Sequence, residues 1–314
     1  MSLKQVIEIS ELLDSARVNG QSMARKLDER GWKEWNVETL TSERGSTDFI
    51  TIVIPGSEGK RGGGSATTLG ILGRLGAIGG RPTVVGMVSD ADGAIVALSV
   101  ALKMIDMRNE GDLLKGDVII TTHICPNSPI SPEASRSPIP MMGSPVSGAV
   151  LREHEVLPEM EAILSIDATK ANRVINQKGF AISYPVKEGY ILRPSDDLLD
   201  IMQKVTGRMP VVFPLATQDI TPTFQLRHIN SIMTPAASAD VPVVGVALTA
   251  EAAVPGIATG ANHPLDLEGA TRFCIEVAKA FGEGKCRFYD PDEFAKIVQL
   301  YGSMKHLQTE GRQS

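Results

Sequence analysis

Five side chains with metal-ligand or nucleophile chemistry each follow an aliphatic, β-branched run of the chain, His263 after an intervening Gly-rich segment. They are Asp90, His123, Cys125, Asp167 and His263. The carboxyl ends of parallel strands meet at one edge of a sheet, so we expect these groups to lie close together. Carboxylates, imidazoles and a thiol are the ligands of zinc and related transition metals. The pattern predicts a metal site formed by Asp90, Asp167, His263 and Cys125, with His123 as proton carrier or further ligand.

Taken one at a time, three of these residues also have a structural interpretation. Asp90 precedes a predicted helix, where a carboxylate can cap free backbone N–H groups. Asp167 can close an Asx turn at the end of its strand. His263 precedes Pro264 and a helix, a position that also suits a surface or capping group.

Short β-branched runs alternate with longer Ala- and Leu-rich segments along the chain, which is typical of an α/β protein. We expect a three-layer sandwich in which a mixed, mostly parallel central sheet has helices on both faces. The predicted strands span 49–55, 67–75, 82–89, 116–122, 162–167, 180–185, 190–193, 210–215 and 241–248. The predicted helices span 91–107, 195–206, 222–233, 264–281 and 291–301, after two short helices in the first 30 residues.

No composition break marks a second domain. We therefore expect residues 1–314 to form a single domain, with an N-terminal helical segment at 1–45 and a frayed polar tail at 303–314. A proline-rich stretch from Cys125 to Pro145 predicts a long irregular loop suited to cover a binding site. Glu133 in this loop is a candidate catalytic base.

The overall charge narrows the classes of partner. The 314 residues include 31 Lys+Arg and 37 Asp+Glu, a formal net charge of −6, which argues against nucleic acid. The longest apolar runs are about half the roughly 20 residues that a membrane helix needs. Three cysteines and a polar N-terminus without a signal-peptide core predict a reduced, cytoplasmic protein.

Four short motifs follow one another along the chain, and their order is informative. They are Val85–Leu98, Ile166–Ala171, Thr217–Asp219 and Gly260–Glu268. Together they resemble the zinc-dependent exopeptidase and deacylase superfamily, in particular its co-catalytic zinc aminopeptidases, over roughly residues 67 to 282.

This resemblance implies a zinc-dependent hydrolase of an amide-type bond in a small peptide or acylated amino acid. It also implies self-association, since members of the superfamily commonly form homo-oligomers. Asp90 is then the bridging carboxylate, Asp167 the next ligand and His263 the last. Asp219 and Asn262 fall in the matching motifs, and we assign both to substrate binding.

The chain departs from the family at two motifs. Arg74-Leu75-Gly76 stands where members carry His-x-Asp, and His123-Ile124-Cys125 stands where they carry a Glu-Glu pair. One interpretation is that His123 and Cys125 replace the carboxylates in a working metal site. Alternatively, the Arg74 guanidinium fills the space of a missing metal and pairs with Asp90, leaving a non-catalytic small-molecule-binding relative. A thiol enzyme using Cys125 activated by His123 is a third interpretation.

Overall fold

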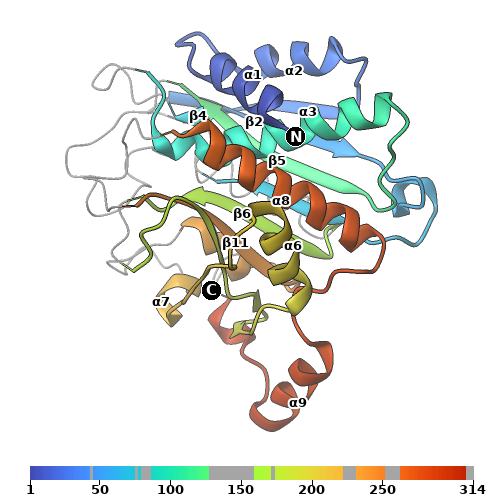
Figure 1. Cartoon of the computed structure of the whole chain (residues 1–314), viewed down its shortest axis with the longest axis vertical. Helices are drawn as coiled ribbons and strands as arrows, with labels where there is room; N and C mark the ends of the chain where they lie inside the picture. The colour runs from blue at the N-terminus through green and yellow to red at the C-terminus, as the bar shows by residue number, and fades with distance from the viewer. Residues whose placement is uncertain are drawn as a thin grey trace.

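A computed structural model describes residues 1–42, 45–74, 77–78, 86–126, 159–170, 174–221, 231–251 and 262–308. These residues form an α/β fold built on one mixed sheet, with strand order β1-β2-β5-β3-β6-β11-β7-β10 (Figure 1). The strands are β1 (Trp35–Ser42), β2 (Gly45–Ile54), β3 (Leu69–Gly73), β4 (Ala77–Ile78), β5 (Val118–Cys125), β6 (Ala162–Ala168), β7 (Gly179–Ser183), β8 (Val186–Lys187), β9 (Tyr190–Ile191), β10 (Val212–Phe213) and β11 (Val243–Thr249). The α-helices are α1 (Leu3–Leu13), α2 (Gly20–Asp28), α3 (Asp92–Asn109), α6 (Asp196–Thr206), α7 (Thr217–Ile220), α8 (Pro264–Gly282) and α9 (Pro291–Tyr301). Short 3₁₀ turns are η1 (Lys60–Gly62), η2 (Ser89–Ala91), η4 (Ser231–Ala237) and η5 (Lys305–Leu307).

The centre of the sheet is parallel. Strands β5, β3, β6 and β11 run in the same direction, while β2 is antiparallel to β5 and β7 is antiparallel to β11. The central strands consist of nearly uninterrupted buried residues, because both of their faces are covered. This arrangement confirms the mixed, mostly parallel sheet that the sequence predicts.

Alternate residues of each strand point into two separate apolar layers. In β3, Ile71 packs into the layer under α1, α3 and α8, whereas Leu72 packs into the layer that contains Ile232 and Met233 of η4. Figure 1 shows α3 and α8 crossing one face of the sheet. Helix α3 is buried all round because α1 and α8 cover the sides that do not face the strands.

A glycine lets the first turn of α3 approach the sheet. A Cβ atom at Gly93 would lie 2.4 Å from the carbonyl oxygen of Ile166 and 2.8 Å from that of Arg74. Only a residue without a side chain fits there, so the start of α3 lies directly over the ends of β3 and β6. This contact fixes the neighbouring Asp90 and Asp92 at the carboxyl edge of the sheet.

Some predicted elements are wrong. The segment at 1–45 is not wholly helical, because β1 pairs with β2 as an antiparallel hairpin at the sheet margin. The predicted strand at 82–89 ends instead in the 3₁₀ turn η2, and its residues 82–85 lie outside the described residues. Of the predicted helix at 222–233, residues 222–230 also lie outside them, and η4 follows as a 3₁₀ turn.

The start of the C-terminal tail is ordered rather than frayed. The Gln308 side chain is buried and donates hydrogen bonds to the backbone oxygens of Ala239 (2.9 Å) and Ala236 (3.4 Å). The Lys305 ammonium lies 2.7 Å from the Asp240 carboxylate. These contacts attach the tail to the segment that follows η4. Among the described residues, no helix is long and apolar enough to cross a membrane.

Candidate active site

Charged side chains gather where the parallel strands end. Arg74 follows β3, His123 is two residues before the end of β5, and Asp167 is the penultimate residue of β6. Asp90, in η2, and Asp92, the first residue of α3, lie beside them. All five side chains are buried. A cluster of charges with so little access to water is costly unless the charges compensate one another, which makes this edge the candidate site.

The Asp90 carboxyl is the least compensated group of the cluster. Its side chain is 2% exposed, and its Oδ2 atom has no hydrogen-bond partner among the described residues. Neither η2 nor α3 has a side-chain cap, so the capping role considered for Asp90 is wrong. Burial raises the pKa of Asp90 well above its usual value, and the nearby charges of Asp167 and Asp92 raise it further.

The Asp92 carboxylate is held by two side chains, one that follows β6 and one that precedes α8. The Lys170 ammonium forms a buried ion pair with one of its carboxylate oxygens, and the Asn262 amide donates a hydrogen bond to the other. Asn262 also donates to the carbonyl oxygen of Val88 (3.2 Å). Burial raises the pKa of Asp92, although Lys170 and Asn262 counteract that rise. Asp92 is therefore a fixed structural anchor that ties α3 to the segment before α8.

Asp167 does not form the Asx turn considered for it. One of its carboxylate oxygens accepts a hydrogen bond from the backbone N–H of the next residue, Ala168 (2.7 Å), whereas an Asx turn uses the residue two further on. The backbone N–H of that residue, Thr169, donates instead to the carbonyl oxygen of Leu248 (2.8 Å). The Asp167 carboxylate lies close enough to Asp90 to raise the pKa of that group.

His123 is a neutral imidazole at physiological pH. Burial and the adjacent Arg74 guanidinium lower its pKa from 6.5 to about 3. Its Nδ1 atom lies 2.9 Å from the Thr47 hydroxyl, which itself donates to the carbonyl oxygen of Ile124 (3.1 Å). The Thr47 hydroxyl proton is thus used, so Nδ1 carries the hydrogen of the imidazole and Nε2 is left as the acceptor. An imidazole with so low a pKa is a weak base.

Cys125 faces the neighbouring strand β2. Its thiol lies 3.7 Å from the carbonyl oxygen of Ser46, and burial raises its pKa. With a protonated thiol and a neutral His123, the two residues do not form the thiolate and imidazolium pair of a cysteine nucleophile. All three cysteines of the chain are free and buried.

His263 lies at the other side of the cluster, as the residue before α8. Its side chain is exposed and makes no capping hydrogen bond. Its charge is close enough to lower the pKa of Asp92 and of Asp266. Asp266 is 8% exposed, and burial is the main cause of its raised pKa.

The structure does not test the site assignment of two further predicted residues. Asp219 is in α7, where its carboxylate accepts a hydrogen bond from the backbone N–H of Ala216 (2.7 Å), an arrangement that caps this short helix. Glu133 lies outside the described residues.

The donor set fits a metal ion in part. The Asp90 and Asp167 carboxylates, one with an unsatisfied oxygen, suit a hard or borderline divalent cation. Within the described ranges, however, no three His, Cys, Asp or Glu side chains form a group that could hold a metal ion.

Two members of the cluster, Asp92 and Lys170, are not among the site residues predicted from the sequence. Both stand inside the motifs quoted above, Asp92 beside Gly93 and Lys170 three residues after Asp167. The available signal was that Asp92 and Lys170, an acid and a base, each follow the end of a predicted strand, where they could meet and form an ion pair.

The fold of the described residues is similar to that of solved aminopeptidases, which agrees with the fold that the resemblance of the motifs implies. The aminopeptidase LapA of Legionella pneumophila is similar at a TM-score of 0.51 and 11% identity, over 92% of this chain and 71% of LapA. A mutant of tomato leucine aminopeptidase is similar at 0.51 and 14% identity, over 87% of this chain and 61% of that enzyme.

The sequence itself gives a narrower assignment. Residues 38–311 match the family model described as "Protein of unknown function (DUF1177)", and the chain belongs to that family. No curated protein matches the sequence.

Proposed function

We propose that this protein is a metal-dependent hydrolase of an amide-type bond in a small peptide or acylated amino acid. The observation that carries the proposal is the buried Asp90 carboxyl, whose unsatisfied oxygen lies close to the charges of Asp167 and Asp92. Mutually repelling carboxylates in a protein interior require a proton or a cation to compensate them. The peptidase-like fold supports a divalent cation in this role.

Asp90 and Asp167 are the proposed carboxylate ligands, and His263 is the proposed ligand from the start of α8. Cys125 is the weakest of the four predicted ligands, because its thiol contacts β2. When bound, a divalent metal polarises the scissile carbonyl and lowers the pKa of a water molecule toward neutrality.

The other residues of the cluster bind and orient. Lys170 and Asn262 hold Asp92 and thereby the start of α3, which directly follows the 3₁₀ turn η2 that contains Asp90. Arg74 places a permanent positive charge next to His123, and we assign it to binding the negative charge of the substrate. With a pKa of about 3, His123 is suited to accept a hydrogen bond through Nε2 rather than to remove a proton at neutral pH.

The metal content of the purified protein tests this proposal. Protein prepared without chelator, and again after incubation with excess Zn²⁺ or Mn²⁺ and desalting, is expected to retain about one ion per chain. The Asp90→Asn variant is expected to retain less than about a tenth of that amount. Asp112→Asn, which makes the same chemical change at an exposed site beyond α3, is the matched control and is expected to retain the wild-type amount.

Release of free amine from acylated amino acids and dipeptides is the second measurement. Activity is expected to require the added ion and to be lost in Asp90→Asn. A chain that retains no ion and cleaves no amide contradicts the proposal and favours the non-catalytic binding relative. Loss of activity in Cys125→Ser with unchanged metal content would instead indicate the thiol enzyme.

A further inference from the structure

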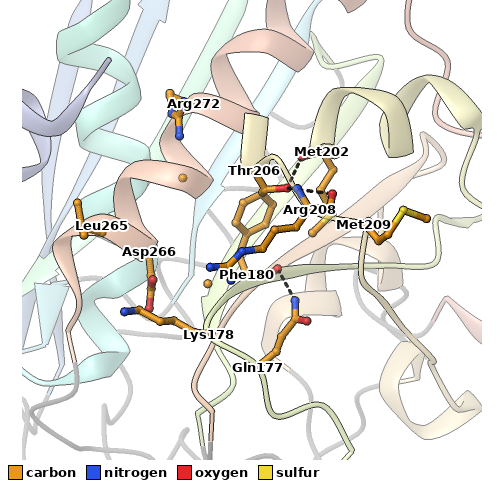
Figure 2. A pocket seen from close by; sticks show the side chains of 12 residues that line it. Gln177, Lys178, Phe180, Met202, Thr206, Arg208, Met209, Leu265, Asp266 and Arg272 are labelled. Carbon is orange, nitrogen blue, oxygen red and sulfur yellow. Dashed lines mark hydrogen bonds between the residues drawn. The ribbon is translucent and has the colours of Figure 1, made fainter. Parts of the chain in front are cut away.

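A pocket beside the candidate site has its own chemical character. It has a volume of about 260 Å³ and lies between β7, the C-terminal end of α6 and the first turns of α8 (Figure 2). Pockets for drug-sized ligands span roughly 300–1,000 Å³, so this one suits a group about the size of a single side chain.

The apolar part of the pocket is formed by Phe180 and Met202, both buried, and by the exposed Leu265 and Met209 at its rim. Gly269 of α8 also lines it. A Cβ atom built at Gly269 would lie 3.6 Å from Cε1 of Phe180, which is ordinary van der Waals contact. The space next to the Phe180 ring is therefore open because Gly269 has no side chain, and a short hydrocarbon fits there.

The charged part of the pocket carries a positive excess. Lys178, Arg208 and Arg272 line it. Arg272 is paired with the Glu268 carboxylate at 3.0 Å, whereas Lys178 and Arg208 form no ion pair within the part of the chain that the structure describes. Asp266 contributes one carboxyl group, whose pKa the nearby charge of Lys178 lowers, so Lys178, Arg208 and Asp266 together keep a net positive charge even when that carboxyl is ionised.

These charged groups lie on one side of the pocket. In Figure 2 the Arg208 side chain extends toward the side on which Lys178 and Asp266 lie. Asp266 is 8% exposed, and its Oδ2 atom has no hydrogen-bond partner among the described residues. The arrangement leaves hydrogen-bonding capacity and positive charge next to an apolar surface.

The pocket adjoins the candidate site directly. Gly179, which lines it, pairs with Thr249, the last residue of β11. The backbone N–H of Asp266 donates to the carbonyl oxygen of His263 (3.0 Å), so the pocket lies one helical turn from that residue. The charges of His263 and Lys170 also act on Asp266, so the pocket lies near these two members of the site.

We propose that this pocket binds the carboxylate-bearing hydrocarbon end of a small ligand, with Lys178 and Arg208 binding the carboxylate and Phe180 packing against the hydrocarbon. The inference rests on the proposed function for its substrate class. The substrate is then an acylated amino acid or short peptide whose free carboxylate enters the pocket while its amide bond lies at the carboxyl edge. Charge-assisted hydrogen bonds supply the selectivity for a carboxylate over a neutral group.

Direct binding tests the pocket independently of catalysis. Full-length protein kept metal-free with chelator is titrated at low salt with hexanoate and with hexanamide, which has the same hydrocarbon and no charge. We expect hexanoate to bind about tenfold more tightly than hexanamide by calorimetry or protein NMR. The double variant Lys178→Gln/Arg208→Gln is expected to bind hexanoate no better than hexanamide, because both substitutions remove exposed positive charges and leave the core intact.

Two controls make the result specific. Lys204→Gln removes an exposed positive charge from α6, four residues before Arg208 and outside the residues that line the pocket, and is expected to leave both affinities unchanged. Gly269→Ala fills the space beside Phe180 without a clash, and is expected to weaken both ligands while the melting temperature stays the same or rises.

Equal affinity for hexanoate and hexanamide, or unchanged hexanoate binding in the double variant, would overturn the pocket assignment. Neither measurement requires metal or hydrolysis. If the protein retains no metal but binds hexanoate selectively, the proposed function fails and the pocket assignment stands. If it hydrolyses amides but shows no preference for hexanoate, the pocket assignment alone fails.

Discussion

His123 makes the stability of the folded protein depend on pH. Its pKa is about 3 in the folded state, against an ordinary 6.5. Between these two values the unfolded chain binds one more proton than the folded chain, so the free energy of unfolding decreases as the pH falls. The stabilising contribution is complete above about pH 6.5 and decreases by about 1.4 kcal/mol per pH unit below it. At about pH 4.5, two units lower, the loss is about 2.7 kcal/mol.

Urea unfolding of the wild type and of His123→Asn at about pH 7 and about pH 4.5 measures this effect. Asparagine places an amide donor near the position of Nδ1, within reach of Thr47, but it does not titrate. The stability advantage of the wild type over the variant is expected to shrink by about 2.7 kcal/mol between the two pH values. Comparing this difference at two pH values cancels the cost of the smaller side chain and the contributions of other titrating groups.

Parallel pH dependence in the two proteins would refute the reasoning. It would mean that the imidazole of His123 is protonated as easily in the folded chain as in the unfolded one. The burial of the ring beside Arg74 would then not exclude its charged form. A wild type that loses more stability than the variant on acidification supports the neutral imidazole.

Three further predictions concern other buried polar groups. Burial and the neighbouring acids raise the pKa of Asp90, so in the metal-free protein its carboxyl destabilises the folded state increasingly as the pH rises from the ordinary pKa toward the raised one. The melting temperature of Asp90→Asn relative to wild type, measured with chelator, should therefore be higher at neutral pH than at about pH 4. A constant difference would contradict this. Lys170→Met leaves the Asp92 carboxylate buried without its cation and should lower the free energy of unfolding in urea by about 3–5 kcal/mol. The double variant Lys170→Met/Asp92→Asn should recover part of this loss. Equal stability of the single and double variants would argue against the ion pair. Gln308→Ala removes two hydrogen bonds to buried carbonyl oxygens and should lower the free energy of unfolding by about 1–2 kcal/mol. Faster proteolysis of the C-terminal tail is the second expected result. A wild-type proteolysis rate would show that the tail is held by other contacts.

The central strands and long helices were predictable from local sequence because their periodicity reflects burial. The buried run Val118–Thr122 and the apolar helix after Asp90 both lie where the pattern indicates. The strand β1 was not predictable in this way. Its residues Trp35–Ser42 are mostly polar or only partly buried, since one neighbour, β2, pairs with it at the margin of the sheet.

The candidate site was predictable in its location but not in its internal contacts. Strand ends identify Asp90, His123 and Asp167, since the topology of a parallel sheet brings such ends together. The pairing of Lys170 with Asp92 depends on how closely α3 approaches β6, which is a tertiary property. Likewise, the low pKa of His123 results from burial against another strand and from Arg74, and neither is visible in the local sequence.

The register of the sheet has a consequence for how the protein folds. Asp48 pairs with Ile124, Leu69 with Ala162, and Ile163 with Val243, so each central ladder joins segments that are far apart in the chain. Such pairings form only after long loops have closed, which makes folding slow compared with that of proteins rich in local contacts. Two members of the site, Asn262 and His263, follow β11 in the chain. A growing or truncated chain that ends before β11 therefore lacks both the amide that holds Asp92 and the proposed metal ligand before α8.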